Sequence, residues 1–313
     1  MKNRLIVLVI YIIIIDLCNN CYSMPIDKTI IDSTVLISDE SGKISGTGFL
    51  VNNDIKTRVY LVTNKHVVSH INTCYKYREK IFLGFKTHQR EWLNIPVKIC
   101  DSSGTVLSGV YPHPNNMVDI IVLNISDILN AYFNKNIKML WLDYSLLATT
   151  NVIKNESINI GDDIFIIGYP KGYRNIYSQT PFVRDGTIAT NTEELLSLEI
   201  KDEFNREMKN INAFIIDANI FPGMSGSPVI LKPRFIIEKN KFINIERGMV
   251  GNYILGILSH VWLYKKTIDK VNIEETIKYY KIERFTNDEI ALGIVFNAQL
   301  IRECIEYLER NNN

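Results

Sequence analysis

The sequence has almost no net charge, which limits the classes of partner. Lysine and arginine together number 35, aspartate and glutamate together number 34, and the formal net charge is +1. A protein that binds nucleic acid through its phosphates needs a basic face, and this balance offers none. We therefore expect no nucleic-acid partner.

Long apolar runs are absent except at the N-terminus. Lys2 and Arg4 precede an uncharged run, Leu5–Ile15, and small side chains follow at Cys21 and Ser23. The run is shorter than the roughly 20 residues that a membrane-spanning helix requires. A positive start, a short apolar segment and small residues are typical of a signal peptide, here cleaved after Ser23. We expect the mature chain to be exported, secreted or periplasmic, without a membrane span; an uncleaved N-terminal anchor is the alternative.

Cysteine is scarce as well, which excludes a scaffold built on disulfides. Removal of the signal peptide leaves Cys74, Cys100 and Cys304, an odd number for an exported chain. A Cys74–Cys100 bridge and three free thiols both fit the sequence. Cys304 lies on the apolar side of a helical pattern near the C-terminus, with Asn297 as the N-cap, and this favours a core position.

Helical periodicity is otherwise rare, and short β-branched and apolar runs alternate with turn residues. In the first half the predicted strands are Thr34–Ile37, Ile44–Val51, Arg58–Thr63, Ile81–Phe85, Ile95–Cys100 and Asp119–Ile125. In the second half they are Asp163–Gly168, Gly186–Thr190, Ala213–Asp217, Ser227–Leu231, Tyr253–Ser259 and Ala291–Phe296. Strands at this spacing favour closed antiparallel barrels. We predict an all-β fold of two six-stranded barrels with a C-terminal helix.

The predicted organisation has three parts. A signal peptide covers 1–23, a first barrel covers 24–150, and a second barrel covers 151–313, with the polar stretch Ala148–Asn159 as the linker. Two insertions interrupt the second barrel, at 232–251 and 263–289. They are interpreted as surface excursions, and the alternative is that one of them covers a cleft or docks a partner.

One turn contains a candidate nucleophile. The run Phe221–Pro228 places Ser225 among glycine and proline residues. Gly223 can adopt backbone angles that a side chain forbids, so consecutive N–H groups can point at one spot beside the hydroxyl. A developing oxyanion needs such a spot. Taken alone, the run fits an ordinary tight turn equally well.

Two distant segments supply the partners that a serine nucleophile needs. His66 follows the apolar run Val59–Thr63, and Asp119 stands at the start of a run that reads as a buried strand. A serine hydroxyl is a poor nucleophile at neutral pH, so an imidazole must take its proton, and a buried carboxylate fixes the imidazole tautomer. The order His66, Asp119, Ser225 matches the chymotrypsin arrangement.

These motifs resemble those of trypsin-like serine peptidases, most closely the peptidase domain of the HtrA (Deg) type. The strongest match is Ile216–Pro228, which is similar to that family's Asp-Ala pair followed by Ile-x-x-Gly-x-Ser-Gly. Further matching segments are Ser45–Val51, Gly161–Pro170, Ile254–Ser259 and Leu292–Phe296. The resemblance implies a serine endopeptidase that acts on proteins or peptides without a metal or cofactor. It also implies an oxyanion hole formed by the N–H groups of Gly223 and Ser225.

The chain departs from the family pattern at two positions. Lys65 stands where the family usually has a small residue before the histidine, and Met224 stands where trypsin has an aspartate that binds a newly cut N-terminus. The resemblance therefore implies no trypsin-style proteolytic activation, and control falls to loop ordering or to a partner. Because the sequence ends soon after the last matching strand, no PDZ domain is expected.

The same resemblance implies a specificity pocket without a carboxylate. Its walls would be formed by Asn219 and Ile220 on one side and by Ser259, His260 and Val261 on the other. Ser259 would also hydrogen-bond Asp119. Without a counter-charge for lysine or arginine, the pocket is expected to prefer small or medium apolar residues before the scissile bond. His260 keeps a glutamyl-type endopeptidase open as an alternative.

The sequence favours a peptidase over two further classes of function. A catalytically silent binding module on the same fold would lack a triad member or block the oxyanion loop, and neither is evident here. A zinc site at His66 and His70 is disfavoured, because the glutamate of the H-E-x-x-H motif is missing.

Overall fold

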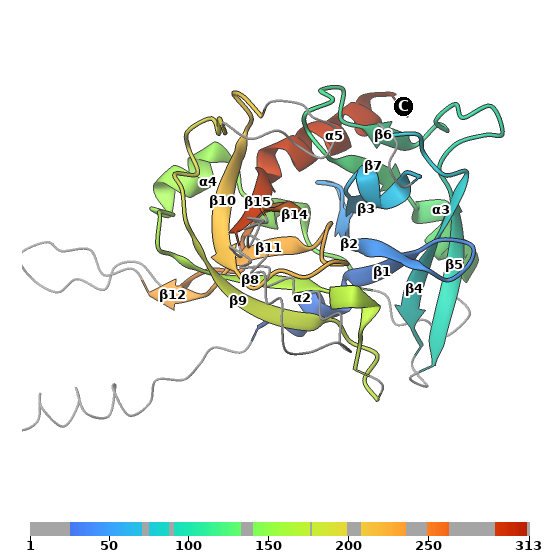
Figure 1. The fold of residues 1–313 in the computed structure, drawn as a ribbon, viewed down its shortest axis with the longest axis horizontal. Coiled ribbons are helices and arrows are strands. Elements are labelled where there is room, and N and C mark those ends of the chain that lie inside the picture. The colour runs from blue at the N-terminus through green and yellow to red at the C-terminus, as the bar shows by residue number, and fades with distance from the viewer. Residues whose placement is uncertain are drawn as a thin grey trace, which may run out of the picture.

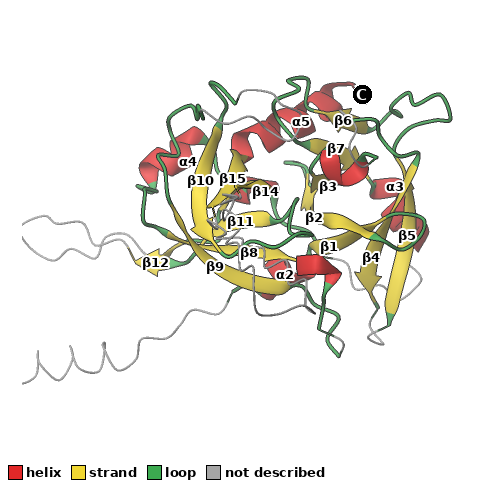
Figure 2. Ribbon diagram, in the orientation of Figure 1, coloured by secondary structure: helices red, strands yellow, loops and turns green. Residues whose placement is uncertain are grey.

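The computed structural model describes residues 26–70, 75–87, 91–132, 140–175, 177–198, 208–235, 249–262 and 292–311. The predicted signal peptide, the insertion at 263–289 and the centre of the insertion at 232–251 lie outside these ranges. In the described part, two antiparallel sheets lie side by side, and helix α5 (Ala298–Asn311) crosses over both of them (Figure 1). Strands dominate, and the helices lie at the periphery (Figure 2).

The first sheet differs from the prediction, because it has seven strands and does not close into a barrel. Its strands are β1 (Thr34–Ser38), β2 (Ile44–Asn52), β3 (Val59–Thr63), β4 (Lys80–Lys86), β5 (Trp92–Lys98), β6 (Val110–Pro112) and β7 (Ile121–Asn124), in the order β5-β4-β1-β2-β3-β7-β6. The strand absent from the prediction is β6, which has three residues and no fully buried side chain. Pro112 has no N–H to donate, which suits an edge strand. The sheet is therefore a half-barrel.

The second sheet is the closed six-stranded barrel that the sequence predicts. Its strands are β8 (Asp163–Gly168), β9 (Phe182–Ile188), β10 (Ala213–Ala218), β11 (Pro228–Leu231), β14 (Ile254–Trp262) and β15 (Leu292–Asn297), in the closed order β10-β15-β14-β11-β8-β9. The two remaining strands, β12 (Arg234–Phe235) and β13 (Met249–Val250), pair with each other at the base of the predicted insertion. Arg234 binds Asp162 at 2.7 Å, which ties this base to the barrel.

Short helices occupy stretches that the sequence did not mark as helical. They are α2 (Lys28–Asp32), α3 (Ser126–Tyr132) and α4 (Thr150–Asn155). The last of these falls within the predicted linker, where the Thr149 hydroxyl accepts the Val152 N–H at 3.2 Å and so caps the first turn. Ile153 of this helix is buried in the core of the second barrel, and Val152 packs against it, so tertiary packing supports the helix together with the cap.

The C-terminal helix joins the two sheets rather than packing on the second barrel alone. One face of α5 buries Leu300, Ile301, Cys304, Ile305 and Leu308 in an apolar cluster to which both sheets contribute. The Tyr60 hydroxyl donates to Glu309, the Tyr144 hydroxyl donates to Glu306 at 2.8 Å, and the ring of Tyr111 stacks on that of Tyr307. The described cysteines are buried. The predicted core position of Cys304 is confirmed, and burial raises the pKa of its thiol. Cys100 is also buried with a free thiol, whereas Cys74 lies outside the described residues.

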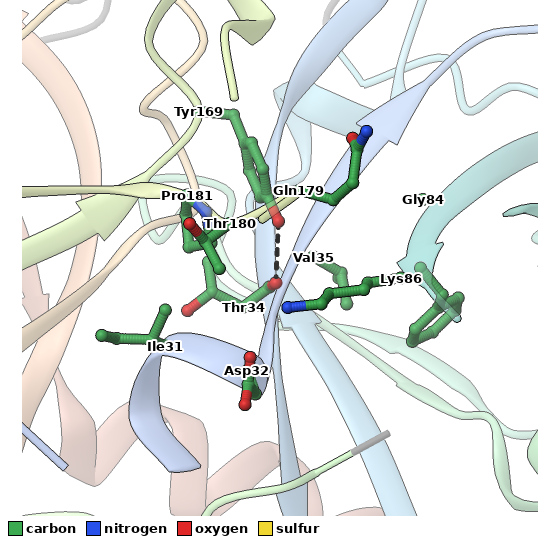
Figure 3. A pocket seen from close by; sticks show the side chains of 11 residues that line it. Ile31, Asp32, Thr34, Val35, Gly84, Lys86, Tyr169, Gln179, Thr180 and Pro181 are labelled. Atoms are coloured by element: carbon green, nitrogen blue, oxygen red, sulfur yellow. Dashed lines mark hydrogen bonds between the residues drawn. The ribbon is translucent and has the colours of Figure 1, made fainter. Parts of the chain in front are cut away.

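A second contact between the sheets joins Tyr169 to the start of β1, next to a small cavity. The Tyr169 hydroxyl donates to the Thr34 carbonyl at 3.2 Å, while Asp32, Lys86 and Gln179 line the space around it (Figure 3). The cavity has a volume of about 20 Å³. That is room for one water molecule, far less than a ligand site needs. The cavity is a packing gap between the two sheets and not a substrate cleft.

Candidate active site

Two neighbouring strands bring the predicted base and the predicted carboxylate together. His66 begins the short helix η1 (His66–Val68) three residues after the end of β3, and Asp119 lies two residues before the start of β7. These strands pair with Thr63 opposite Ile121, so the two segments meet at the same end of the sheet. The pairing register of β3 and β7 therefore brings His66 and Asp119, which are 53 positions apart, within hydrogen-bonding distance.

Asp119 is fully buried and accepts three hydrogen bonds. Its Oδ2 lies 2.5 Å from His66 Nδ1 and accepts the Ser259 hydroxyl at 2.6 Å, while its Oδ1 accepts the His66 backbone N–H at 3.1 Å. A carboxylate is an acceptor only, so three donors suit its ionised form. The contact between Ser259 and Asp119 that the resemblance implies is confirmed. Asp101 and Asp127, which also lie between the histidine and the serine in the sequence, are exposed and lie elsewhere.

The turn around Ser225 depends on the backbone freedom of Gly223. Gly223 has a φ of +93°, and a Cβ there would lie 2.7 Å from the Tyr169 carbonyl oxygen. Only glycine therefore fits this position without strain.

The peptide between Pro222 and Gly223 is oriented by one hydrogen bond. The Pro222 carbonyl accepts the Lys171 N–H at 2.5 Å. Because a trans peptide holds C=O and N–H in opposite directions, this bond turns the Gly223 N–H away from Lys171. Among the described residues, no acceptor binds the N–H of Gly223 or of Ser225. Both groups are available to a ligand.

The Ser225 hydroxyl is held by the neighbouring strand β14. It donates to the Ser259 carbonyl at 3.0 Å, while the Gly226 N–H donates to the Leu258 carbonyl at 2.8 Å. Ser259 thus links both halves of the site, since its hydroxyl binds Asp119 and its carbonyl binds Ser225. Asp119 and Ser225 therefore both bind this one residue, and His66 is connected to it through Asp119, although the three come from distant segments.

The other predicted pocket residues have different environments. Asn219 is exposed directly after β10, whereas Ile220 is 6% exposed and belongs to the core of the second barrel. Ser259 is almost fully buried between Asp119 and the nucleophile turn. The backbone of His260 and Val261 lies in β14, and their side chains fall outside the description.

Two residues that support the site, Thr47 and Asn64, were not predicted from the sequence. The Thr47 hydroxyl donates to the Gly223 carbonyl at 2.8 Å, and the Thr47 N–H donates to the Ser225 carbonyl at 2.8 Å. The Asn64 side chain donates to the Asp119 carbonyl at 2.7 Å. Thr47 lies in the matching segment Ser45–Val51, and Asn64 lies two residues before His66. Hydrogen bonds between segments so far apart leave no trace in a local pattern.

The comparisons with known proteins agree with this geometry. The family model described as trypsin-like peptidase domain matches residues 46–233. The chain belongs to the trypsin-like peptidase family. Its enzyme class is therefore that of the serine peptidases, and its substrates are peptides. No curated protein sequence matches.

Solved structures of other proteins show distant similarity to this chain. The active form of the Rv3671c protease from M. tuberculosis has 16% sequence identity and a TM-score of 0.47, with 91% of this chain and 84% of that chain covered. An inactive form of the same protease has 17% identity and a TM-score of 0.45, with 91% and 92% covered. Deg5 has 18% identity and a TM-score of 0.41, with 73% and 79% covered. At these scores the family model, rather than these structures, carries the assignment.

The longest of the described helices, α5, has 14 residues. Over the ranges given above, none is both long enough and apolar enough to span a membrane.

Proposed function

We propose that this trypsin-like peptidase is an endopeptidase with His66 as the general base, Asp119 as its orienting carboxylate and Ser225 as the nucleophile. One observation carries the proposal. The buried Asp119 carboxylate contacts His66 Nδ1 at 2.5 Å and is joined through Ser259 to the Ser225 hydroxyl. A histidine whose Nδ1–H is bound by a carboxylate keeps its Nε2 lone pair free to accept a proton.

The first half of the reaction forms an acyl-enzyme. A rotation about the Ser225 Cα–Cβ bond moves the hydroxyl from the Ser259 carbonyl toward His66. As Oγ attacks the substrate carbonyl carbon, its proton passes to Nε2, and the imidazolium is stabilised by Asp119. The oxyanion is bound by the N–H groups of Gly223 and Ser225, each of which contributes about 3–4 kcal/mol in comparable sites.

The second half releases the products. The C–N bond breaks as Nε2 returns its proton to the leaving amine, which leaves an ester between the acyl group and Ser225. A water molecule then attacks this ester while His66 takes one of its protons, and the proton finally returns to Ser225 as the C–O bond breaks. The acid and the free enzyme are the products.

Asp119→Asn is expected to lower kcat by about 10⁴-fold with little change in fold. The amide presents an N–H group to His66 Nδ1 and so favours the tautomer whose Nε2 carries the proton and cannot accept another. Steady-state hydrolysis of a peptide substrate measures the loss. Asp101→Asn is the matched control, because Asp101 is exposed in a surface turn. Equal activity of the two variants would contradict the assignment of Asp119.

We also propose that the enzyme prefers small or medium apolar residues before the scissile bond. Supporting this preference, none of the five residues assigned to the pocket is acidic, so a lysine or arginine would be buried there without a counter-charge. Cleavage of a peptide library by the purified chain measures the preference. Dominant cleavage after lysine or arginine contradicts it, and dominant cleavage after glutamate supports the glutamyl-type alternative instead.

Export by a signal peptide at residues 1–23 is part of the same proposal. The support is the short apolar run after Lys2 and Arg4. N-terminal sequencing of the exported chain tests it, since cleavage after Ser23 leaves Met24 as the first residue, and an intact N-terminus would favour an anchor.

The direct test of catalysis is covalent labelling with a fluorophosphonate, which reacts with an activated serine hydroxyl. The adduct should map to Ser225 by mass spectrometry of the digested chain. If the folded wild type remains unlabelled, a catalytically silent binding module replaces the peptidase.

A further inference from the structure

Lys65, immediately before the proposed base, is one of the most deeply buried side chains of the protein. It is 1% exposed, and lysine is among the residues that proteins almost never bury fully unless they are paired. Transfer of an ammonium group from water into a protein interior costs several kcal/mol, so its partners must repay that cost.

The partners of the Lys65 ammonium lie in one loop and on one aromatic ring. Nζ donates to the His113 carbonyl at 2.6 Å and to the Asn115 carbonyl at 3.1 Å, and it lies 5.1 Å from the centre of the Tyr75 ring. A cation over an aromatic face gains further stabilisation when water is excluded. Burial and the nearby Lys65 charge together lower the pKa of the His113 imidazole.

The two carbonyls belong to the loop that ends at the proposed orienting carboxylate. This loop is tightly connected within itself: the His113 N–H donates to the Ile120 carbonyl at 2.9 Å, and the Val118 N–H donates to the Asn115 carbonyl at 3.0 Å. The Asn115 carbonyl is therefore shared by the Lys65 ammonium and a backbone donor one residue from Asp119. A change in the position of this carbonyl moves the carboxylate.

We propose that Lys65 is a positioning residue of the peptidase site, whose ammonium fastens the Asp119 loop to the segment that carries His66. The inference rests on the proposed function of His66 and Asp119. One side chain then fixes both partners, because its backbone precedes His66 directly and its Nζ holds the loop that precedes Asp119. At only 1% exposure Lys65 cannot contact a substrate, so its effect falls on catalysis and not on substrate binding.

The test compares the full chain carrying Lys65→Met with wild type. Methionine keeps the apolar stem and removes the donors, so we expect kcat to fall by about 100-fold with KM changed less than about threefold, as expected for a displacement near 1 Å. The proton NMR signal of His66 Nδ1–H, deshielded by its short bond to Asp119, should move or broaden. Lys80→Met is the matched control, because Lys80 forms a surface ion pair with Glu40.

The results of labelling and of kinetics distinguish the proposed peptidase activity from the proposed role of Lys65. A wild type that does not label with fluorophosphonate contradicts the peptidase, and the positioning role falls with it. A labelled wild type together with a folded Lys65→Met variant that retains both kcat and the Nδ1–H signal overturns the role of Lys65 alone. If Lys65→Met loses its thermal unfolding transition, Lys65→Gln replaces it, because its amide nitrogen ends one bond short of the Nζ position and so cannot bind both the His113 and the Asn115 carbonyl. Unchanged kcat in that folded variant likewise overturns the inference.

Discussion

Replacement of Ser225 by alanine is expected to lower kcat for peptide hydrolysis by about 10⁶-fold, the loss typical of a serine peptidase without its nucleophile. The fold should persist, because the Ser225 side chain makes one hydrogen bond, to the Ser259 carbonyl. Its backbone carbonyl keeps the bond from the Thr47 N–H in the variant. Hydrolysis of a peptide substrate and the thermal unfolding midpoint, measured on the same preparation, separate chemistry from stability.

The matched control lies two residues further along the same turn. Ser227 is fully buried, and among the described residues its hydroxyl has no hydrogen-bond partner. Ser227→Ala should therefore leave both hydrolysis and fluorophosphonate labelling close to wild type. Equal labelling of Ser225→Ala and wild type would show that another residue is the nucleophile.

Replacement of His66 by alanine is expected to cause a loss of similar size, about 10⁶-fold in kcat, because Ser225 then has no base to take its proton. The fold should again persist: the imidazole side chain is 23% exposed, and the backbone N–H of residue 66 still binds Asp119. Loss of one donor from a buried carboxylate costs about 1–3 kcal/mol of stability. Hydrolysis rates and thermal unfolding measure the two effects separately.

His70→Ala is the control for this variant, since His70 is exposed and lies four residues away. It should hydrolyse peptide at the wild-type rate. Residual activity of His66→Ala within tenfold of wild type would mean that the base has been misassigned.

The expected effects differ in size because the residues act at different steps. Without Ser225 or His66 no acyl-enzyme forms by this route, whereas Asp119→Asn leaves the nucleophile and the base in place but disfavours the reactive tautomer. Lys65→Met should have the smallest effect, because it leaves every reacting group present and alters only their separation. This ranking is itself a test of the proposed roles.

The strand pattern could be predicted from the sequence because burial on a sheet requires runs of β-branched and apolar residues. Each predicted strand overlaps an observed one, and only the ends shifted. The exception in the first sheet is β6, where Val110–Pro112 is too short and too exposed to give such a run. Whether a sheet closes into a barrel could not be predicted either, since closure depends on whether its two edge strands pair with each other. In the first sheet they do not.

The site was predictable in its residue types but not in its connections. Histidine, aspartate and serine in this order, beside a glycine-rich turn, indicated a serine peptidase, and the match to the trypsin-like family confirms the class. The role of Lys65 was not readable, because the sequence showed only an unusual lysine before the histidine. Its acceptors, the His113 and Asn115 carbonyls, lie about 50 residues away.

The sequence by itself determined the β-rich fold and the candidate residues, which follow from local pattern and spacing, and it indicated the family through motifs that resemble those of trypsin-like peptidases. Only the tertiary structure decided that the Ser259 carbonyl accepts the Ser225 hydroxyl, that the Pro222 carbonyl turns toward Lys171, and that α5 spans both sheets. Those features are hydrogen bonds and packing contacts between segments far apart in the chain. Their partners are chosen by how the two sheets meet, which no local pattern records.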